Sequence, residues 1–251
     1  MTDDDLTRAA EWLTLAERVC VLTGAGVSAE SGVPTFRASD GLWEGHRIED
    51  VASPDGFVRD PRLVWQFYNA RRANVKTVKP NPGHHALAKL EERWGDGFTL
   101  VTQNVDGLHR AAGSRNVLEI HGSLHRTRCL GCERVKDRGL EPLGDAPECE
   151  CGARLRPDIV WFGEALPPDI WHRAMEAAYE CDVMLVVGTS AVVHPAASLV
   201  PIAKRARPPG AKVVEVNLTR TEASAFADAG LYGPSGVVLP KLVERLGERP
   251  A

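Results

Sequence analysis

Residues 18–29 read Arg-Val-Cys-Val-Leu-Thr-Gly-Ala-Gly-Val-Ser-Ala, and this stretch decides the fold. Its first half, Arg18–Thr23, is a short apolar run rich in β-branched residues, which predicts a buried strand. Its second half follows the pattern G-x-G-x-x-A directly after that strand. Glycines in such a turn let the backbone approach a pyrophosphate, and the helix that follows offers free N–H groups. The stretch predicts a nucleotide-binding turn, although on its own it also fits a tight turn without function.

Apolar runs of the same kind alternate with helical patterns along the rest of the chain. The further expected strands are Phe98–Thr102, Asn116–Ile120, Asp182–Val187 and Ala211–Val216. The expected helices fall at about Leu6–Ala16, Pro61–Asn74, Gly83–Trp94, Pro168–Glu180, Pro195–Ala206 and Pro240–Leu246. Strands that are apolar almost throughout are typical of a parallel sheet covered on both faces, so we expect an open α/β sheet. Two segments interrupt it: 38–80, with turns and one helix, and 126–157, which holds four cysteines.

Composition narrows the class of protein. The 251 residues carry 30 Lys and Arg against 34 Asp and Glu, a net charge of −4, which gives no indication of nucleic-acid binding. No apolar run reaches the roughly 20 residues that span a bilayer, and the acidic start of the chain, Met1–Asp5, does not resemble a signal peptide. We therefore expect a cytoplasmic protein without membrane partners and without direct nucleic-acid binding.

Four of the six cysteines form two close pairs, Cys129 with Cys132 and Cys149 with Cys151. Such pairs on either side of a polar, turn-rich insert are what four thiolates need to surround one Zn²⁺. Because protein ligands would fill all four positions, the metal would be structural. The alternative is two buried thiol pairs without metal, and the short Cys149–Cys151 spacing makes one chelate unusually tight.

The segment after the glycine turn argues against a dehydrogenase. A dehydrogenase should carry an Asp or Glu about 20 residues further on, at the end of a second strand, to bind the ribose hydroxyls. This chain instead continues into a Gly/Pro loop, Ser31–Arg37, and then Gly41–Trp43. The departure favours a mobile lid over the ligand. Arg37 in it could pair with phosphate, but it fits a solvated surface arginine equally well.

Polar side chains follow the expected strands where each of them ends. They are Gln103, Asn104 and Asp106 after one strand, His121 after the next, and Gly188-Thr189-Ser190 and Asn217 after the last two. Any one of these groups could simply cap a helix. Because ligands of parallel α/β sheets bind beyond the carboxyl ends of the strands, we expect all of them to meet in one crevice.

These motifs together resemble those of the sirtuin family. The residues that carry the resemblance are Gly24–Ser28, Gly32–Arg37, Thr102–Asp106, His121–Ser123, Trp161–Glu164, Gly188–Ser190 and Glu215–Asn217. The resemblance covers nearly the whole chain. It implies a Rossmann-like, doubly wound lobe that binds NAD, formed by 1–37, 81–125 and 158–251. It also implies a smaller lobe with one structural Zn²⁺, formed by 38–80 and 126–157.

The resemblance implies an NAD-dependent protein-lysine deacylase that acts on acylated protein-lysine substrates and releases nicotinamide and O-acyl-ADP-ribose. His121 and Asn104 would be catalytic, with His121 taking a proton from a ribose hydroxyl. Backbone of the substrate peptide would add as a strand beside Val160, Phe162, Gly163 and Glu164. The implied NAD-binding residues are Gly24, Ala25, Gly26, Ser28, Thr35, Phe36, Arg37, Trp43, Gln103, Asn104, Val105, Asp106, Gly188, Thr189, Ser190, Asn217, Leu218 and, near adenine, Ser235. His84, His85, His125 and His194 have no role in these motifs.

One helix indicates which acyl group is removed. Tyr68 and Arg71 stand three residues apart and so share a helix face, where a phenol and a guanidinium can bind a carboxylate together. The pair resembles the Tyr-x-x-Arg of sirtuins that remove succinyl, malonyl or glutaryl groups, and Ala52 matches the small residue that widens their pocket. We therefore expect a desuccinylase and demalonylase that is also a deacetylase. Tyr and Arg are, however, common on amphipathic helices.

Other functions share parts of this pattern. A protein ADP-ribosyltransferase would use the same departure of nicotinamide with another nucleophile, and a deacetylase alone would need no carboxylate clamp. A non-catalytic NAD sensor would keep the glycine turn but would not need His121. A plain dehydrogenase fits least, because the acidic residue for the ribose is missing.

Overall fold

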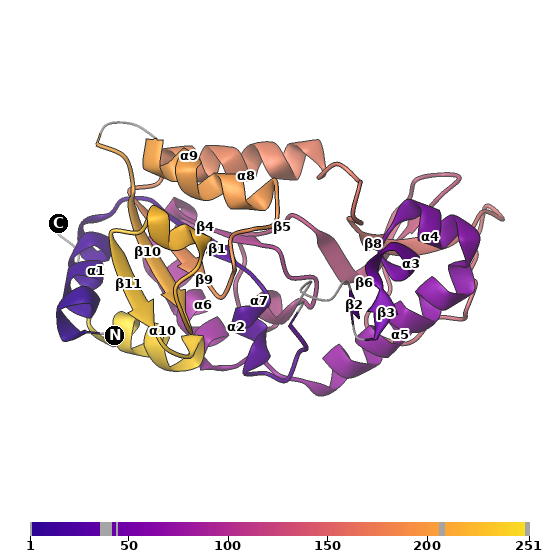
Figure 1. Ribbon diagram of the computed structural model, residues 1–251, viewed down its shortest axis with the longest axis horizontal. Coiled ribbons are helices and arrows are strands. Elements are labelled where there is room, and N and C mark those ends of the chain that lie inside the picture. Colours follow the sequence, from indigo (N-terminus) through magenta and orange to yellow (C-terminus); the bar gives the residue numbers. More distant parts are fainter. Residues whose placement is uncertain (1, 36–41, 44, 206–208, 249–251) are drawn as a thin grey trace.

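The computed structural model describes residues 2–35, 42–43, 45–205 and 209–248 (Figure 1). Its strands are β1 (Val19–Thr23), β2 (Leu42–Trp43), β3 (His46–Arg47), β4 (Phe98–Thr102), β5 (Val117–Glu119), β6 (Gly122–Cys129), β7 (Val135–Asp137), β8 (Leu155–Ile159), β9 (Val183–Val187), β10 (Lys212–Asn217) and β11 (Ala229–Tyr232). Its α-helices are α1 (Asp3–Leu15), α2 (Gly26–Ala29), α3 (Ile48–Val51), α4 (Pro54–Arg59), α5 (Pro61–Thr77), α6 (Pro82–Trp94), α7 (Leu108–Ala111), α8 (Pro168–Glu180), α9 (Leu199–Arg205) and α10 (Ser235–Glu244). Short 3₁₀ turns are η2 (Gly95–Gly97), η3 (Ala196–Ser198) and η4 (Glu222–Ala225).

The larger part of the molecule is built on a six-stranded sheet with the order β11-β10-β9-β1-β4-β5. Every neighbouring pair in it is parallel. Counted along the chain, these strands lie in the order 3-2-1-4-5-6 when read from β5, which is the doubly wound dinucleotide-binding order. The predicted α/β fold is therefore confirmed. The order reverses beside β1, and the ligand crevice of such a sheet lies at that reversal.

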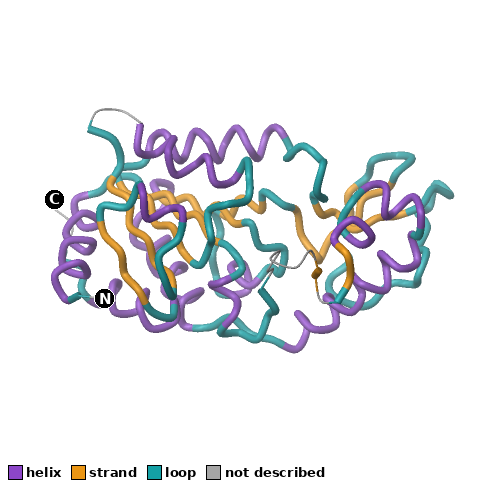
Figure 2. The backbone as a smooth tube through the Cα atoms, in the orientation of Figure 1, coloured by secondary structure: helices purple, strands orange, loops and turns teal. Residues whose placement is uncertain are grey.

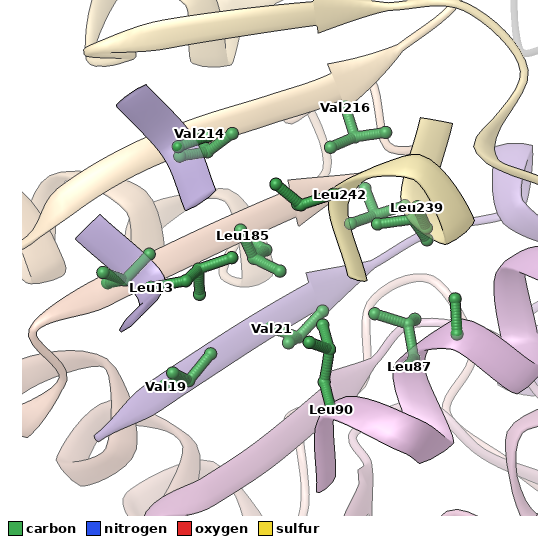
Figure 3. Close-up of a cluster of buried hydrophobic side chains, with 14 of the residues drawn as sticks. Leu13, Val19, Val21, Leu87, Leu90, Leu185, Val214, Val216, Leu239 and Leu242 are labelled. Carbon is green, nitrogen blue, oxygen red and sulfur yellow. The ribbon is translucent and has the colours of Figure 1, made fainter. Parts of the chain in front are cut away.

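Helices cover both faces of this sheet. Helices α8 and α9 lie together on one face, and α1, α6 and α10 lie on the other (Figures 1 and 2). Figure 3 shows how Leu13 of α1, Leu90 of α6 and Leu242 of α10 meet the valines and leucines of the strands. Burial of each such side chain stabilises the fold by about 1.5–3 kcal/mol. Because both faces are covered, the central strands are buried along their whole length, and this explains their unbroken apolarity.

The smaller part combines the three-stranded antiparallel sheet β7-β6-β8 with helices α3, α4 and α5. Its own apolar core contains Trp65, Tyr68 and Trp161 and is separate from the two clusters on the large sheet. Strands β6 and β8 extend across the predicted lobe limits at 125/126 and 157/158. We propose that the limits lie before Gly122 and after Ile159, so that each strand belongs to one lobe.

Several predicted elements need correction. The last helix begins at Ser235, not at Pro240, which lies inside it. Packing of Val238 and Leu239 on the core outweighs the missing proline N–H. The edge strand β11 was missed because its sequence, Ala-Gly-Leu-Tyr, is weakly strand-forming. Segment 38–80 holds three described helices rather than one, and the helix expected from Pro195 is η3 followed by α9.

None of the helices in the described part of the chain has the length and apolarity needed to cross a membrane.

Candidate active site

A cavity of about 480 Å³ lies between the large sheet and the small lobe. It is lined at one end by loops that follow β1, β4, β9 and β10, and at the other end by α5 and the segment after β8. The predicted site residues that it brings together are Gly24, Ala25, Gly26, Thr35, Ala52, Tyr68, Arg71, Gln103, Asn104, Val105, Asp106, His121, Val160, Phe162, Gly163, Glu164, Gly188, Thr189, Ser190 and Asn217. The expected convergence at the carboxyl edge of the sheet is therefore observed.

The glycine turn after β1 packs directly against the turn after β9. The Gly26 N–H donates to the Gly188 carbonyl at 2.7 Å, and a Cβ built on Gly26 would lie 2.7 Å from that same oxygen. Only glycine lets these two backbones approach so closely. The helix that follows, α2, has four residues, so the positive helix end predicted here is a single turn. The N–H groups of Gly24, Gly26, Val27 and Ser28 all donate to backbone carbonyls, so the turn does not present a row of free N–H groups to an anion.

Polar side chains behind the cavity hold one another in place. The Asn104 Nδ2 donates to the Gly24 carbonyl and to Ser28 Oγ, both at 3.1 Å. Ser28 in turn donates to the Asp106 carboxylate at 2.8 Å, so it supports the cavity wall from below rather than lining it. Burial raises the pKa of Asp106, and the hydrogen bonds from Leu108 N–H and Ser28 partly offset this. An amide and a carboxylate are thereby fixed before any ligand arrives.

Two further side chains tie three of the strand-end loops together. Gln103 Nε2 donates to Thr189 Oγ1 at 2.9 Å, which joins the loop after β4 to the loop after β9. Asn217 Nδ2 donates to the Thr189 carbonyl at 2.9 Å and adds the loop after β10. The three loops form one polar rim around the cavity.

His121 stands two residues after the end of β5 and lines the cavity. Its Nδ1 lies 3.2 Å from the Gln103 carbonyl oxygen. Because a carbonyl can only accept, Nδ1 carries the proton and Nε2 keeps its lone pair. Burial lowers the pKa of His121, while the hydrogen bond to Gln103 raises it in part. The ring is therefore neutral near pH 7 and chemically able to accept a proton.

The far end of the cavity is formed by α5. Tyr68 and Arg71 both line it from one face of that helix, and Ala52 lines the same cavity. Tyr68 is fully buried, and this raises the pKa of its phenol to about 12 although the Arg71 charge lowers it. The same positive charge also lowers the pKa of Asp106. A protonated phenol and a guanidinium thus sit side by side at this end.

The segment Val160–Glu164 departs from the extended edge predicted for it. Phe162 and Gly163 form a turn, closed by the Glu164 N–H donating to the Trp161 carbonyl at 3.0 Å, with Gly163 at φ +88°. The N–H groups of Val160 and Phe162 already donate to His121 and Ala52 carbonyls. The N–H groups of Val160 and Phe162 are therefore not free to pair with an added strand, and binding of a peptide beside this segment stays a prediction.

The four paired cysteines form one cluster at the tip of the small lobe. Their Sγ atoms all lie within 4.8 Å of one another, with Cys129 to Cys151 at 3.5 Å and Cys132 to Cys149 at 3.8 Å. Four thiolates around a tetrahedral Zn²⁺ at 2.3 Å have sulfur atoms about 3.8 Å apart. The cluster fits a structural zinc in spite of its short second spacing.

Some predicted site residues lie away from the cavity or outside the described residues. Phe36 and Arg37 are not among the described residues, and of Trp43 only the backbone in β2 is described. Leu218 is exposed, and Ser235 Oγ donates to Glu30 at 3.0 Å at the start of α10. Neither lies among the described residues that line the cavity, so their contacts with NAD stay predictions.

The structure also reveals residues that the motifs did not assign. His194 lines the cavity. His84 is buried behind it and approaches Ser28 Oγ at 3.3 Å. Glu215 is fully buried and accepts hydrogen bonds from Thr221 N–H at 3.1 Å and Tyr232 OH at 2.9 Å, which fixes the loop after β10. A glutamate inside an apolar strand must find hydrogen-bond partners when it is buried. The position of Glu215 in the apolar run of β10 could therefore have indicated its supporting role from the sequence.

Comparisons with known proteins agree with this geometry. The model of the Sir2 family matches residues 24–195. NAD-dependent protein deacylase 2 of Pyrobaculum aerophilum is 49% identical over 243 residues, which cover 96% of this chain and 95% of that protein. A crystal structure of a Sir2 homolog–NAD complex superposes with a TM-score of 0.87 at 44% identity, covering 97% of this chain and 93% of that one. A Sir2 protein with a deacetylated p53 peptide and 3′-O-acetyl ADP ribose gives a TM-score of 0.85 at 32% identity, covering 96% and 99%.

The doubly wound sheet, the polar rim and the four-cysteine lobe define an enzyme of the NAD-dependent protein deacylase class. Within that class, the chain belongs to the Sir2, or sirtuin, family.

Proposed function

We propose that this enzyme removes succinyl and malonyl groups, and also acetyl groups, from lysine side chains of proteins, with NAD as co-substrate. The observation that carries the acyl preference is the placement of Tyr68 and Arg71 on one face of α5, in the same cavity as His121. A carboxylate at the end of an acyl chain would accept from the phenol and pair with the guanidinium. Ala52, with a single methyl group, leaves room for the longer chain.

The fixed geometry of the polar rim supports the roles that we propose for its residues. Asn104 and Asp106 would hold the nicotinamide and ribose end of NAD, and Thr189 and Asn217 the adenosine end. His121 would take a proton from a ribose hydroxyl through its free Nε2, after nicotinamide has left and the acyl oxygen has joined the sugar. The product would be nicotinamide with O-acyl-ADP-ribose, in keeping with the acetyl ADP ribose bound in one Sir2 structure.

An acylated lysine peptide would enter beside Val160–Glu164, as that same Sir2 structure holds a deacetylated peptide. The carbonyl groups of this segment, rather than its N–H groups, would bind the peptide backbone, since the donors of Val160 and Phe162 are used internally. Phe162 is about half exposed (47%) at the mouth of the cavity, where the aliphatic part of the lysine would pass.

The decisive experiment compares acetyl- and succinyl-lysine peptides of the same sequence, with the wild type and Arg71→Met. Loss of charge-assisted bonds should lower kcat/KM for the succinyl peptide by about 10- to 100-fold and leave the acetyl rate much less changed. Equal effects on both peptides would contradict the carboxylate clamp and favour a deacetylase alone.

Mass spectrometry of the products separates the reaction types. Nicotinamide and succinyl-ADP-ribose should appear together. ADP-ribose on the protein acceptor, without acyl-ADP-ribose, would instead indicate an ADP-ribosyltransferase.

A further inference from the structure

The Tyr68 hydroxyl has a buried partner outside the cavity-facing clamp. Trp161 Nε1 donates to the Tyr68 OH at 2.9 Å, across 93 positions of sequence. Both side chains are buried, at 0% and 3% exposure, and their rings lie 6.5 Å apart between centroids. An indole N–H can only donate, so the phenol oxygen is the acceptor in this bond.

This bond limits where the phenol's own proton can point. The indole N–H occupies one acceptor position of the oxygen, so the hydroxyl proton turns away from Trp161. Tyr68 lines the cavity, and no described residue accepts from it. The group offered to a ligand is therefore an O–H donor, which suits a carboxylate acceptor. The raised pKa, about 12, keeps that proton in place at neutral pH.

Trp161 is itself held on two sides. The Arg156 guanidinium carbon lies 3.5 Å from the centroid of its ring, which is close cation–π stacking. Arg156 also pairs with both oxygens of Glu164, at 2.6 and 2.8 Å, and Glu164 accepts the Trp161 backbone N–H at 2.8 Å. The indole is thus fixed by a charged pair that belongs to the same turn as the candidate peptide-binding segment.

We propose that Trp161 is a positioning residue for acyl-group selection: its indole N–H orients the Tyr68 hydroxyl as a donor toward the carboxylate of an acidic acyl group. This inference rests on the proposed function. It adds that selectivity depends on Trp161, which lines the same cavity, as well as on the two residues of the clamp. It also connects the turn beside the peptide to the acyl end of the cavity through the Trp161 indole.

The test is Trp161→Phe, which removes the N–H and keeps an aromatic ring under Arg156. We expect the ratio of succinyl to acetyl kcat/KM to fall about three- to tenfold, the size of one neutral hydrogen bond, mostly through KM for the succinyl peptide. The matched control is Trp65→Phe. Trp65 is equally buried in the same lobe, but its indole donates to the Leu155 carbonyl at 3.0 Å, so the ratio should not change.

A merely structural role for Trp161 would lower both rates together and leave the ratio unchanged, and that result would overturn the proposal. A double-mutant cycle with Tyr68→Phe gives a second readout. Once the hydroxyl is absent, Trp161→Phe should no longer change the ratio, and a persisting change would also overturn the proposal. If Arg71→Met and Tyr68→Phe are themselves without selective effect, the proposed acyl preference fails. If Arg71→Met and Tyr68→Phe lower the ratio of succinyl to acetyl kcat/KM and Trp161→Phe does not, the proposed acyl preference stands and only the role of Trp161 fails.

Discussion

The two ends of the cavity are constructed in different ways. At the large sheet, the polar groups follow strands of one parallel sheet, and hydrogen bonds such as that from Asn217 to Thr189 join the loops of neighbouring strands. At the small lobe, a helix residue, Tyr68, meets a loop residue, Trp161, through packing and a single hydrogen bond. The first end is set by the backbone of the fold. The second is set by side chains, so its chemistry can change without disturbing the sheet.

Removal of the metal should produce the largest difference between the two ends of the cavity. With Cys132→Ser or a strong chelator, we expect the small lobe to unfold and activity to fall to background, because binding of a structural zinc is itself folding free energy. The amides of β1 and β4 should keep their protection from hydrogen exchange while those of β6 and β8 lose it.

The matched control is Cys181→Ser, since Cys181 is buried in the large-sheet core outside the cluster. It should keep the zinc content of the wild type. Unchanged protection of β6 after metal loss would show that the small lobe does not depend on zinc.

Loss of the imidazole should disable the sheet end without unfolding it. His121→Gln is expected to lower kcat by about 10²- to 10⁴-fold, the usual contribution of a general base, with little change in Tm. His125→Gln serves as the control, because this half-buried ring only approaches the Asp106 carbonyl at 3.4 Å. Equal kcat values for the two variants would show that His121 is not the general base.

An arginine with two ion pairs connects the large sheet to the small lobe, and its contribution to stability can be measured. Arg126 of β6 pairs with Glu119 of β5 at 2.7 Å and with Asp158 of β8 at 2.9 Å, and both carboxylates are buried. Arg126→Met leaves two buried charges with weaker partners, so the free energy of unfolding should fall by about 2–3 kcal/mol in urea titrations.

Arg128 is nearly half exposed and, among the described residues, forms its ion pair with Asp158, so Arg128→Met should cost about 1 kcal/mol or less. Equal losses for the two arginines would mean that bridging the lobes adds nothing to stability.

A smaller effect concerns acid stability of the sheet end. Burial lowers the pKa of His84 from 6.5 to about 4. Between these values the unfolded chain binds a proton that the native protein does not, so stability falls as the pH falls. The loss from pH 6.5 to 5 is about 1.5 kcal/mol for this group. His84→Gln should reduce the slope of unfolding free energy against pH, whereas exposed His85→Gln should not. Identical slopes for wild type and His84→Gln would refute this.

The same contrast explains what the sequence could predict. The sheet end was predictable because each polar group stands immediately after an apolar run, and parallel topology brings such positions together. The four cysteines were predictable from spacing alone. The bond between Trp161 and Tyr68 was not, because it joins elements 93 positions apart in an irregular turn. The start of α10 was missed for a related reason: core packing, and not local propensity, sets where it begins.

The position of the zinc ligands along the chain has a consequence for biosynthesis. All four lie between positions 129 and 151, so metal capture closes only a short loop, at small entropic cost. Strands β9, β10 and β11 are made later, and β1 must wait for β9 before its second neighbour is present. On the ribosome, the metal-bound tip can therefore mature while the nucleotide-binding half is still an incomplete sheet.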